Sequence, residues 1–130
     1  MREDLRRVIR KQFGGGTVAA DLLTSGYRAM WTIVCFDLPV GSKAERRNAT
    51  RFRKFLLDQG FTMKQWSVYH RYHPTRDQAE AAAERVGTAV PSLGSVSIYF
   101  ITDKQYGQTR NYEGAYRAET EEKPDQLTLL

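Results

Sequence analysis

The chain has 130 residues, of which 41% are hydrophobic and 27% charged, and its formal net charge is +5. These values are typical of one globular domain with a modest core, and the basic excess favours a polyanionic partner. A single cysteine, Cys35, excludes an internal disulfide framework and a Cys/His zinc site. Because no run of eighteen apolar residues and no apolar signal segment occurs, we expect no membrane contact and a cytoplasmic location.

The first 29 residues are predicted to form an N-terminal arm. Apolar residues at helical spacing, with basic residues between them, predict a short amphipathic helix over 2–13. Three glycines at 14–16 end this helix and form a hinge.

An apolar run that begins at Met30 ends on one carboxylate, Asp37, and Pro39 and Gly41 then end the predicted strand. An acid at the end of a buried strand is costly unless something compensates its charge. One interpretation is a hydrogen bond to the following loop or a helix cap. The other interpretation is a metal ligand or a general base.

The remaining elements follow from strong local signals. A capping box at Ser42–Glu45 predicts a helix that runs to Gln59, and Gly60 ends it in a left-handed conformation. An extended stretch over 61–72, a second capped helix over 75–90 and a strand over 95–102 come next.

With the stretch over 61–72 folded as a hairpin, the order is strand, helix, two strands, helix, strand. This order predicts an α+β, ferredoxin-like βαββαβ fold, with an antiparallel sheet and two helices on one face. Several aromatic residues fall on the predicted strands, which makes a fully wet second face improbable. We therefore expect a homodimer whose sheets pack face to face.

The first predicted helix carries a basic stripe. At 100° per residue, Lys43, Arg47, Arg51 and Lys54 fall within about 80° of one another, and Arg46 adds a further cation. One interpretation is an ordinary solvated helix face. The other is a track for phosphates, which follows a nucleic-acid backbone and reads no sequence.

The two histidines, His70 and His73, are three residues apart and would point to opposite faces of a strand. They could hold a metal only if the strand breaks between them, and otherwise we expect surface or interface histidines. Phosphate-loop, dinucleotide, nucleophile-elbow and zinc-protease motifs are all absent from the sequence.

Four segments in this order resemble the CRISPR-associated adaptation proteins of the Cas2 family, in the variant of type II systems. They are Phe36–Pro39 (FDLP), Glu45–Arg47 leading to Phe52–Leu56, Gly60–Phe61 with Gln65–Tyr69 (QWSVY), and Thr102–Tyr106 (TDKQY). The resemblance covers about residues 30–106. Each segment alone is weak, but their order and spacing make a chance match improbable.

The resemblance implies a ferredoxin-like homodimer that works in spacer acquisition. Such a dimer sits between two dimers of the CRISPR integrase and holds double-stranded spacer DNA on its basic surface. The resemblance also implies a Mg²⁺-dependent endonuclease for RNA or DNA, with Mn²⁺ as a substitute metal. The aspartate that ends the first strand carries this activity, which assigns catalysis and metal binding to Asp37, one copy per subunit.

The resemblance divides the chain into an arm over 1–29, a core over 30–106 and a C-terminal extension over 107–130. The arm is extra, since family members usually begin close to the first strand, and the extension could supply a docking or swapped strand. Two other functions stay open. One is a non-catalytic DNA-binding scaffold, and the other is a ferredoxin-like sensor of small molecules.

Overall fold

The computed structural model describes residues 29–124, so all but the last residue of the arm expected over 1–29, and the docking strand expected at 126–130, lie outside the described residues. The elements in chain order are β1 (Met30–Asp37), α3 (Lys43–Asp58), β2 (Thr62–Gln65), β3 (Val68–His73), α4 (Arg76–Thr88), β4 (Ser95–Thr102), α5 (Asp103–Gly107), β5 (Asn111–Glu113) and β6 (Tyr116–Ala118). Among these residues, no helix is both long and apolar enough to span a bilayer.

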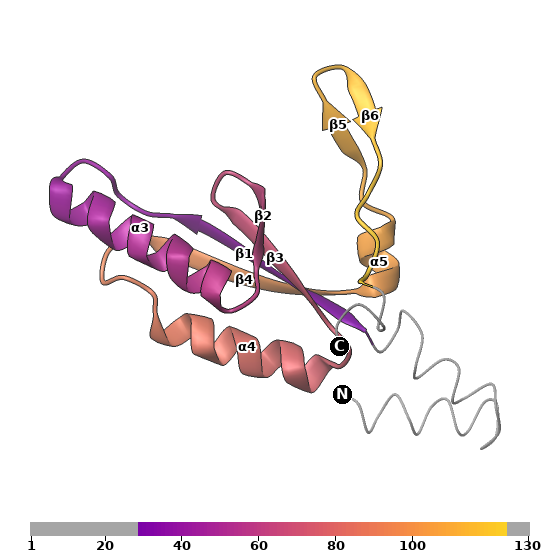
Figure 1. The fold of residues 1–130 in the computed structure, drawn as a ribbon, viewed down its shortest axis with the longest axis horizontal. Helices are drawn as coiled ribbons and strands as arrows, with labels where there is room; N and C mark the ends of the chain where they lie inside the picture. Colours follow the sequence, from indigo (N-terminus) through magenta and orange to yellow (C-terminus); the bar gives the residue numbers. More distant parts are fainter. Residues whose placement is uncertain (1–28, 125–130) are drawn as a thin grey trace.

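The main sheet has the strand order β2-β3-β1-β4, and every neighbouring pair is antiparallel. The predicted βαββαβ order is therefore confirmed, with the stretch over 61–72 folded as the β2–β3 hairpin. Helices α3 and α4 lie side by side against one face of the sheet (Figure 1).

The core lies between this sheet face and the two helices. Val34 and Phe36 of β1 pack in one buried cluster with Phe52 and Leu56 of α3 and with Val86 of α4. Successive side chains of a strand point to opposite faces, so the odd-numbered residues of β1 lie on the face without α3 and α4, called here the helix-free face.

The predicted ends of α3 are confirmed. Ser42 and Glu45 form a reciprocal capping box, with the Glu45 amide donating to Ser42 Oγ at 3.1 Å and the Ser42 amide donating to Glu45 Oε1 at 2.8 Å. Gly60 follows the helix with a φ of 85°, the left-handed conformation that a glycine adopts without strain.

One end of the helix-free face is covered by α5. The Tyr106 ring stacks on the Trp31 indole with 4.0 Å between ring centroids, and Trp31 Nε1 donates to Asp103 Oδ1 at 2.8 Å. The other end, toward Asp37, is exposed at Ser97 and at Tyr99, which is 56% exposed.

The described part of the C-terminal extension forms α5's end and the β5–β6 hairpin, which projects away from the main sheet (Figure 1). The segment after β6 returns to the sheet, where Lys64 Nζ contacts both carboxylate oxygens of Glu121, at 2.7 and 2.8 Å. The sequence reasoning anticipated neither the hairpin nor this contact.

Candidate metal and nucleic-acid site

Asp37 is the last residue of β1 and lies on the helix-free face, paired across the strands with Ser95 of β4. It is exposed, and within residues 29–124 nothing forms a hydrogen bond or an ion pair with its carboxylate. A carboxylate left free at the end of a buried strand keeps all its acceptor positions for a ligand.

The helix-cap interpretation of Asp37 is not supported for the helix that follows. The first turn of α3 is capped by Ser42, whose hydroxyl accepts from the Glu45 amide, and Asp37 takes no part. Asp37 is exposed, so water solvates its charge, and its role as a metal ligand or general base stays a prediction.

The backbone of Asp37 is held by the loop before β4. Gly94 has a φ of 99°, and a Cβ at this position would lie 2.8 Å from the Asp37 carbonyl oxygen and 2.8 Å from Leu38 Cδ2. Only glycine permits this approach, because it combines positive φ with the absence of a side chain. Gly94 thus fixes where β1 ends.

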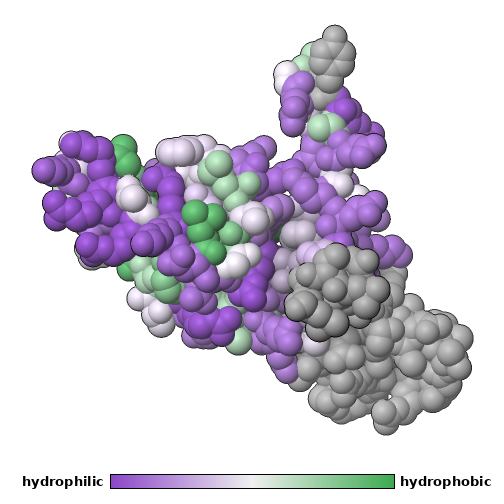
Figure 2. Space-filling model, viewed as in Figure 1, coloured by the Kyte–Doolittle hydropathy of each residue, from purple (hydrophilic) through white to green (hydrophobic). Residues whose placement is uncertain are grey.

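The five cations of the basic stripe are all exposed on α3, and Figure 2 shows a hydrophilic surface over this helix. None of them forms an ion pair with a carboxylate of residues 29–124, and the guanidinium of Arg46 donates to the Val40 carbonyl oxygen at 3.2 Å. The one acidic side chain in their midst, Glu45, is used in the capping box. The stripe therefore presents positive charge without local neutralisation.

The histidines do not form a metal pair. Both lie in the unbroken strand β3, on opposite faces, and both are buried, at 6% exposure for His70 and 2% for His73. Neither histidine lies at the surface of the chain, and α5 covers His70 through Tyr106, while the alternative of interface histidines stays a prediction. No group of three or more His, Cys, Asp or Glu residues suited to a metal occurs in the part of the chain that the structure describes.

Instead, His70 belongs to a line of hydrogen bonds. The Tyr106 hydroxyl donates to Glu121 Oε2 at 3.2 Å, so its single proton is committed and His70 Nδ1 donates to the hydroxyl oxygen at 2.6 Å. Burial lowers the pKa of His70 and raises the pKa of Tyr106 well above its usual value, with the Glu121 carboxylate adding to the second effect. Both groups are thus held neutral at pH 7.

A family model described as "CRISPR associated protein Cas2" matches residues 30–109, which is more than half of the chain. The chain belongs to the Cas2 family. The match begins at β1 and ends just after α5, so it contains Asp37, the basic stripe and Gly94.

Several curated proteins of the same family are similar to this chain. A Cas2 protein of Paracidovorax avenae is 45% identical over 83% of this chain and 100% of its own length. One of Flavobacterium psychrophilum is 41% identical over 80% of this chain and 90% of its own length. One of Parvibaculum lavamentivorans is 44% identical over 78% of this chain and 100% of its own length. Each of the three is named a CRISPR-associated endoribonuclease Cas2.

Asp37 is an exposed acid of the described residues 29–124, and one such carboxylate can supply part of a magnesium site. Mg²⁺ is typically bound by one or two carboxylates, several waters and substrate phosphates rather than by a full protein cage. The exposed Asp37 carboxylate could be one ligand of such a set.

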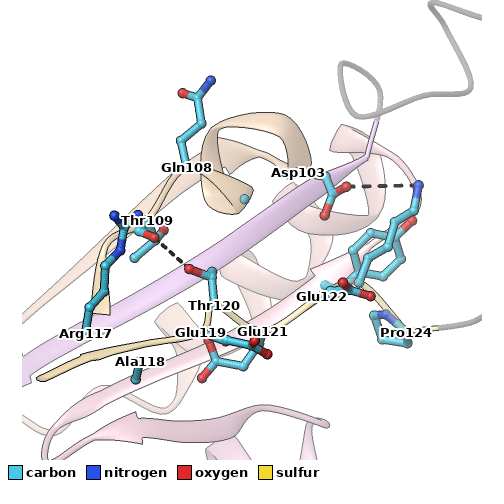
Figure 3. Close-up of a pocket in the computed structure, with 13 residues that line it drawn as sticks. Asp103, Gln108, Thr109, Arg117, Ala118, Glu119, Thr120, Glu121, Glu122 and Pro124 are labelled. Atoms are coloured by element: carbon cyan, nitrogen blue, oxygen red, sulfur yellow. Dashed lines mark hydrogen bonds and ion pairs between the residues drawn. The ribbon is translucent and has the colours of Figure 1, made fainter. Parts of the chain in front are cut away.

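One groove of the described Cas2 structure is separate from this site. It lies between α5 and the segment after β6 (Figure 3), and neither Asp37 nor any cation of the basic stripe lines it. Its acidic residues, which are Asp103, Glu119, Glu121 and Glu122, would repel a phosphate.

The sequence reasoning missed two residues near the Asp37 end of the sheet. Gly94 could have been found from the Pro91–Gly94 turn, since a glycine directly before a strand often marks positive φ. The hairpin predicted over 61–72 was given no turn residues, and the structure places Trp66 in the β2–β3 turn, where it is 73% exposed.

Proposed function

We propose that this Cas2-family protein acts in CRISPR spacer acquisition as a homodimeric, DNA-binding subunit that bridges integrase dimers. We also propose that it cleaves phosphodiester bonds of RNA or DNA at paired Asp37 residues, with Mg²⁺. The observation that carries the second part is the exposed, unengaged carboxylate of Asp37 at the end of β1. The names of the curated relatives support it.

The helix-free face suits a second copy of the chain. Ile33 and Cys35 are only half-buried on it and Tyr99 is 56% exposed, so apolar surface remains beside Asp37. Two such faces packed together would bury this surface and bring one Asp37 from each subunit to the interface.

The paired carboxylates explain why one chain lacks a complete metal site. Two unpaired carboxylates brought close repel each other, and a cation between them removes that repulsion. When bound, Mg²⁺ supplies an activated water and stabilises negative charge on the phosphate. The two Asp37 side chains would hold the metal, and Gly94 would fix the backbone from which each carboxylate projects.

The basic stripe serves binding rather than cleavage. Its cations, which are Lys43, Arg46, Arg47, Arg51 and Lys54, are exposed along one side of α3 and would contact successive phosphates. Such contacts position a duplex without reading its sequence, as a subunit that accepts any spacer requires.

Cleavage by wild type and by Asp37→Asn, with Mg²⁺ or Mn²⁺, tests the enzymatic proposal. Asn keeps the size of the side chain but loses its charge, so we expect the cleavage rate to fall at least about 100-fold. Glu84→Gln, at an exposed carboxylate on α4 away from the basic stripe, is the matched control and should cleave at the wild-type rate. Equal rates for wild type and Asp37→Asn would remove Asp37 from the mechanism.

The second candidate function is a DNA-binding scaffold that cleaves nothing. It is favoured by the single acid per chain and by a basic stripe that is independent of that acid. Spacer acquisition in cells separates the two, because a scaffold with Asp37→Asn should still acquire spacers while Arg47→Ala/Arg51→Ala should not. Family membership leaves no observation in favour of the small-molecule sensor.

A further inference from the structure

Trp66 occupies an unusual position for an indole. It lies in the two-residue turn between β2 and β3 and is 73% exposed, whereas the other tryptophan, Trp31, is 5% exposed. An exposed indole keeps an apolar ring face and an N–H donor available to a ligand.

The ring is nevertheless held in place. The Arg53 guanidinium lies 4.3 Å from the Trp66 ring centroid and 5.6 Å from that of Phe36, so it is layered between a buried ring and an exposed one. One face of the indole is thus covered by Arg53, and no other ring of residues 29–124 stacks on it. The opposite face is open to solvent, which its exposure requires.

The turn that carries Trp66 is also fixed. Ser67 has a φ of 65°, and its carbonyl oxygen accepts from the Phe36 amide at 3.1 Å. This bond ties the turn to the residue directly before Asp37. A rigid, solvent-facing ring therefore lies at the same end of the sheet as the candidate catalytic carboxylate.

Charge indicates what the open ring face would bind. Arg53 and the basic stripe belong to the same helix, and at 100° per residue Arg46 lies about 20° from Arg53 around the helix axis. A ligand that stacks on Trp66 would therefore lie on the Arg46 side of α3, about 80–160° around the helix axis from Lys43, Arg47, Arg51 and Lys54. Flat aromatic groups joined by phosphates are the bases of a nucleic acid.

We propose that Trp66, backed by Arg53, is a stacking platform for an unpaired nucleobase of a single strand or a strand end. The platform reads no hydrogen-bonding edge, so it accepts any base of DNA or RNA. This inference rests on the proposed nucleic-acid binding and adds a strand-holding site at the Asp37 end of the sheet, on the side of α3. Bases inside a blunt duplex are already stacked and would gain nothing from Trp66.

A protein partner is the competing occupant, because Leu57 of α3 and Met63 of β2 are each 53% exposed and add apolar surface to these two elements. The unneutralised cations on α3 favour the nucleic acid, since a protein would need a matching acidic surface to cover them. The test below separates the two occupants.

The test measures binding of labelled single-stranded DNA, single-stranded RNA and blunt duplex DNA of one length at low salt. Trp66→Ala should weaken binding of both single strands about tenfold and change duplex binding less than about twofold. Trp66→Phe keeps an aromatic ring and should stay within about threefold of wild type. Tyr112→Ala, at a residue 60% exposed on β5, is the matched control and should have no effect. A 2-aminopurine base in the strand should be quenched by wild type but not by Trp66→Ala.

If Trp66→Ala loses binding of only one of the two single strands, DNA or RNA, the site is assigned to that nucleic acid. Unchanged single-strand binding by Trp66→Ala would overturn the platform, and so would equal losses for single strand and duplex. Loss of integrase capture with nucleic-acid binding intact would assign Trp66 to a protein contact instead. If Arg47→Ala/Arg51→Ala weakens binding of all three nucleic acids while Trp66→Ala weakens binding of none, the platform is wrong and the proposed nucleic-acid binding stands. If wild type binds no probe, both fail.

Discussion

Gly94 lies so close to the backbone of Asp37 that a Cβ on Gly94 would come within 2.8 Å of the Asp37 carbonyl oxygen. The glycine belongs to the loop before β4, and the aspartate ends β1, which pairs with β4. The position of the candidate metal ligand therefore depends on a residue nearly sixty positions later in the chain. No property of Asp37 and its sequence neighbours reveals this dependence.

Gly94→Ala should destabilise the protein by about 1–3 kcal/mol, because the new methyl group meets backbone atoms at a positive φ. It should also reduce cleavage by displacing Asp37. Gly87→Ala is the matched control, because Gly87 lies in α4 with no heavy atom within 4 Å of its Cβ position. That change should stabilise by up to about 1 kcal/mol. Urea unfolding measures the free energy of unfolding of both variants. Equal changes of this free energy in the two variants would contradict the prediction.

Arg47→Ala/Arg51→Ala should lower the salt dependence of DNA binding. Each phosphate contact contributes about 0.9 to the slope of log affinity against log salt concentration, so the double variant should lose about 2 from that slope. Arg110→Ala/Arg117→Ala removes the same charge from exposed positions outside the stripe and serves as control. A slope unchanged in the first variant, or reduced equally in both, would make the stripe an ordinary solvated face.

Tyr106→Phe should destabilise the protein by about 1–3 kcal/mol. It leaves the buried Nδ1–H of His70 without its acceptor and removes a donor from Glu121, while the stacking on Trp31 is kept. Tyr112→Phe, at an exposed tyrosine, should change the free energy of unfolding by less than about 0.5 kcal/mol. Equal stability of wild type and Tyr106→Phe would show that the hydrogen bonds around the hydroxyl add nothing to stability.

Acid should destabilise the protein through His73. Burial, with the charges of Arg71 and Arg85, lowers the pKa of His73 from 6.5 to about 4. Between these values the unfolded chain binds the proton and the folded chain does not, so the free energy of unfolding falls as pH falls from 6.5 toward 4. The loss should be of the order of 3 kcal/mol.

Urea unfolding at several pH values between 7 and 4.5 checks this prediction. The lowered pKa of His70 acts in the same direction, so His73→Gln should reduce the slope without abolishing it. A wild-type free energy of unfolding that is flat below pH 6.5 would contradict the prediction, as would an unchanged slope in His73→Gln.

Local signals were enough to predict much of the fold. The capping box at Ser42 and Glu45, the stop at Gly60 and the apolar run of β1 each depend on neighbouring residues, and all three are confirmed. The strand–helix periodicities then leave few arrangements other than the observed sheet.

Features that depend on contacts between distant segments could not be predicted in this way. His70 was expected at the surface or at an interface, because its burial depends on Tyr106 of α5, a helix after the predicted strand over 95–102 that the sequence reasoning did not predict. Trp66 was placed in a strand because its β propensity is high, while the turn there is stabilised by the bond from Phe36 to Ser67. Asp37 was found because an acid at the end of an apolar run is visible in the sequence alone.

The central claim is that two Asp37 carboxylates from two subunits hold one divalent cation. A crystal structure of the dimer with Mn²⁺, read by anomalous scattering, tests it most directly. We predict one peak on the two-fold axis, about 2.1–2.2 Å from an Asp37 oxygen of each subunit. Asp37 carboxylates more than about 10 Å apart, with no peak between them, would contradict the claim, because they could not coordinate the same ion directly.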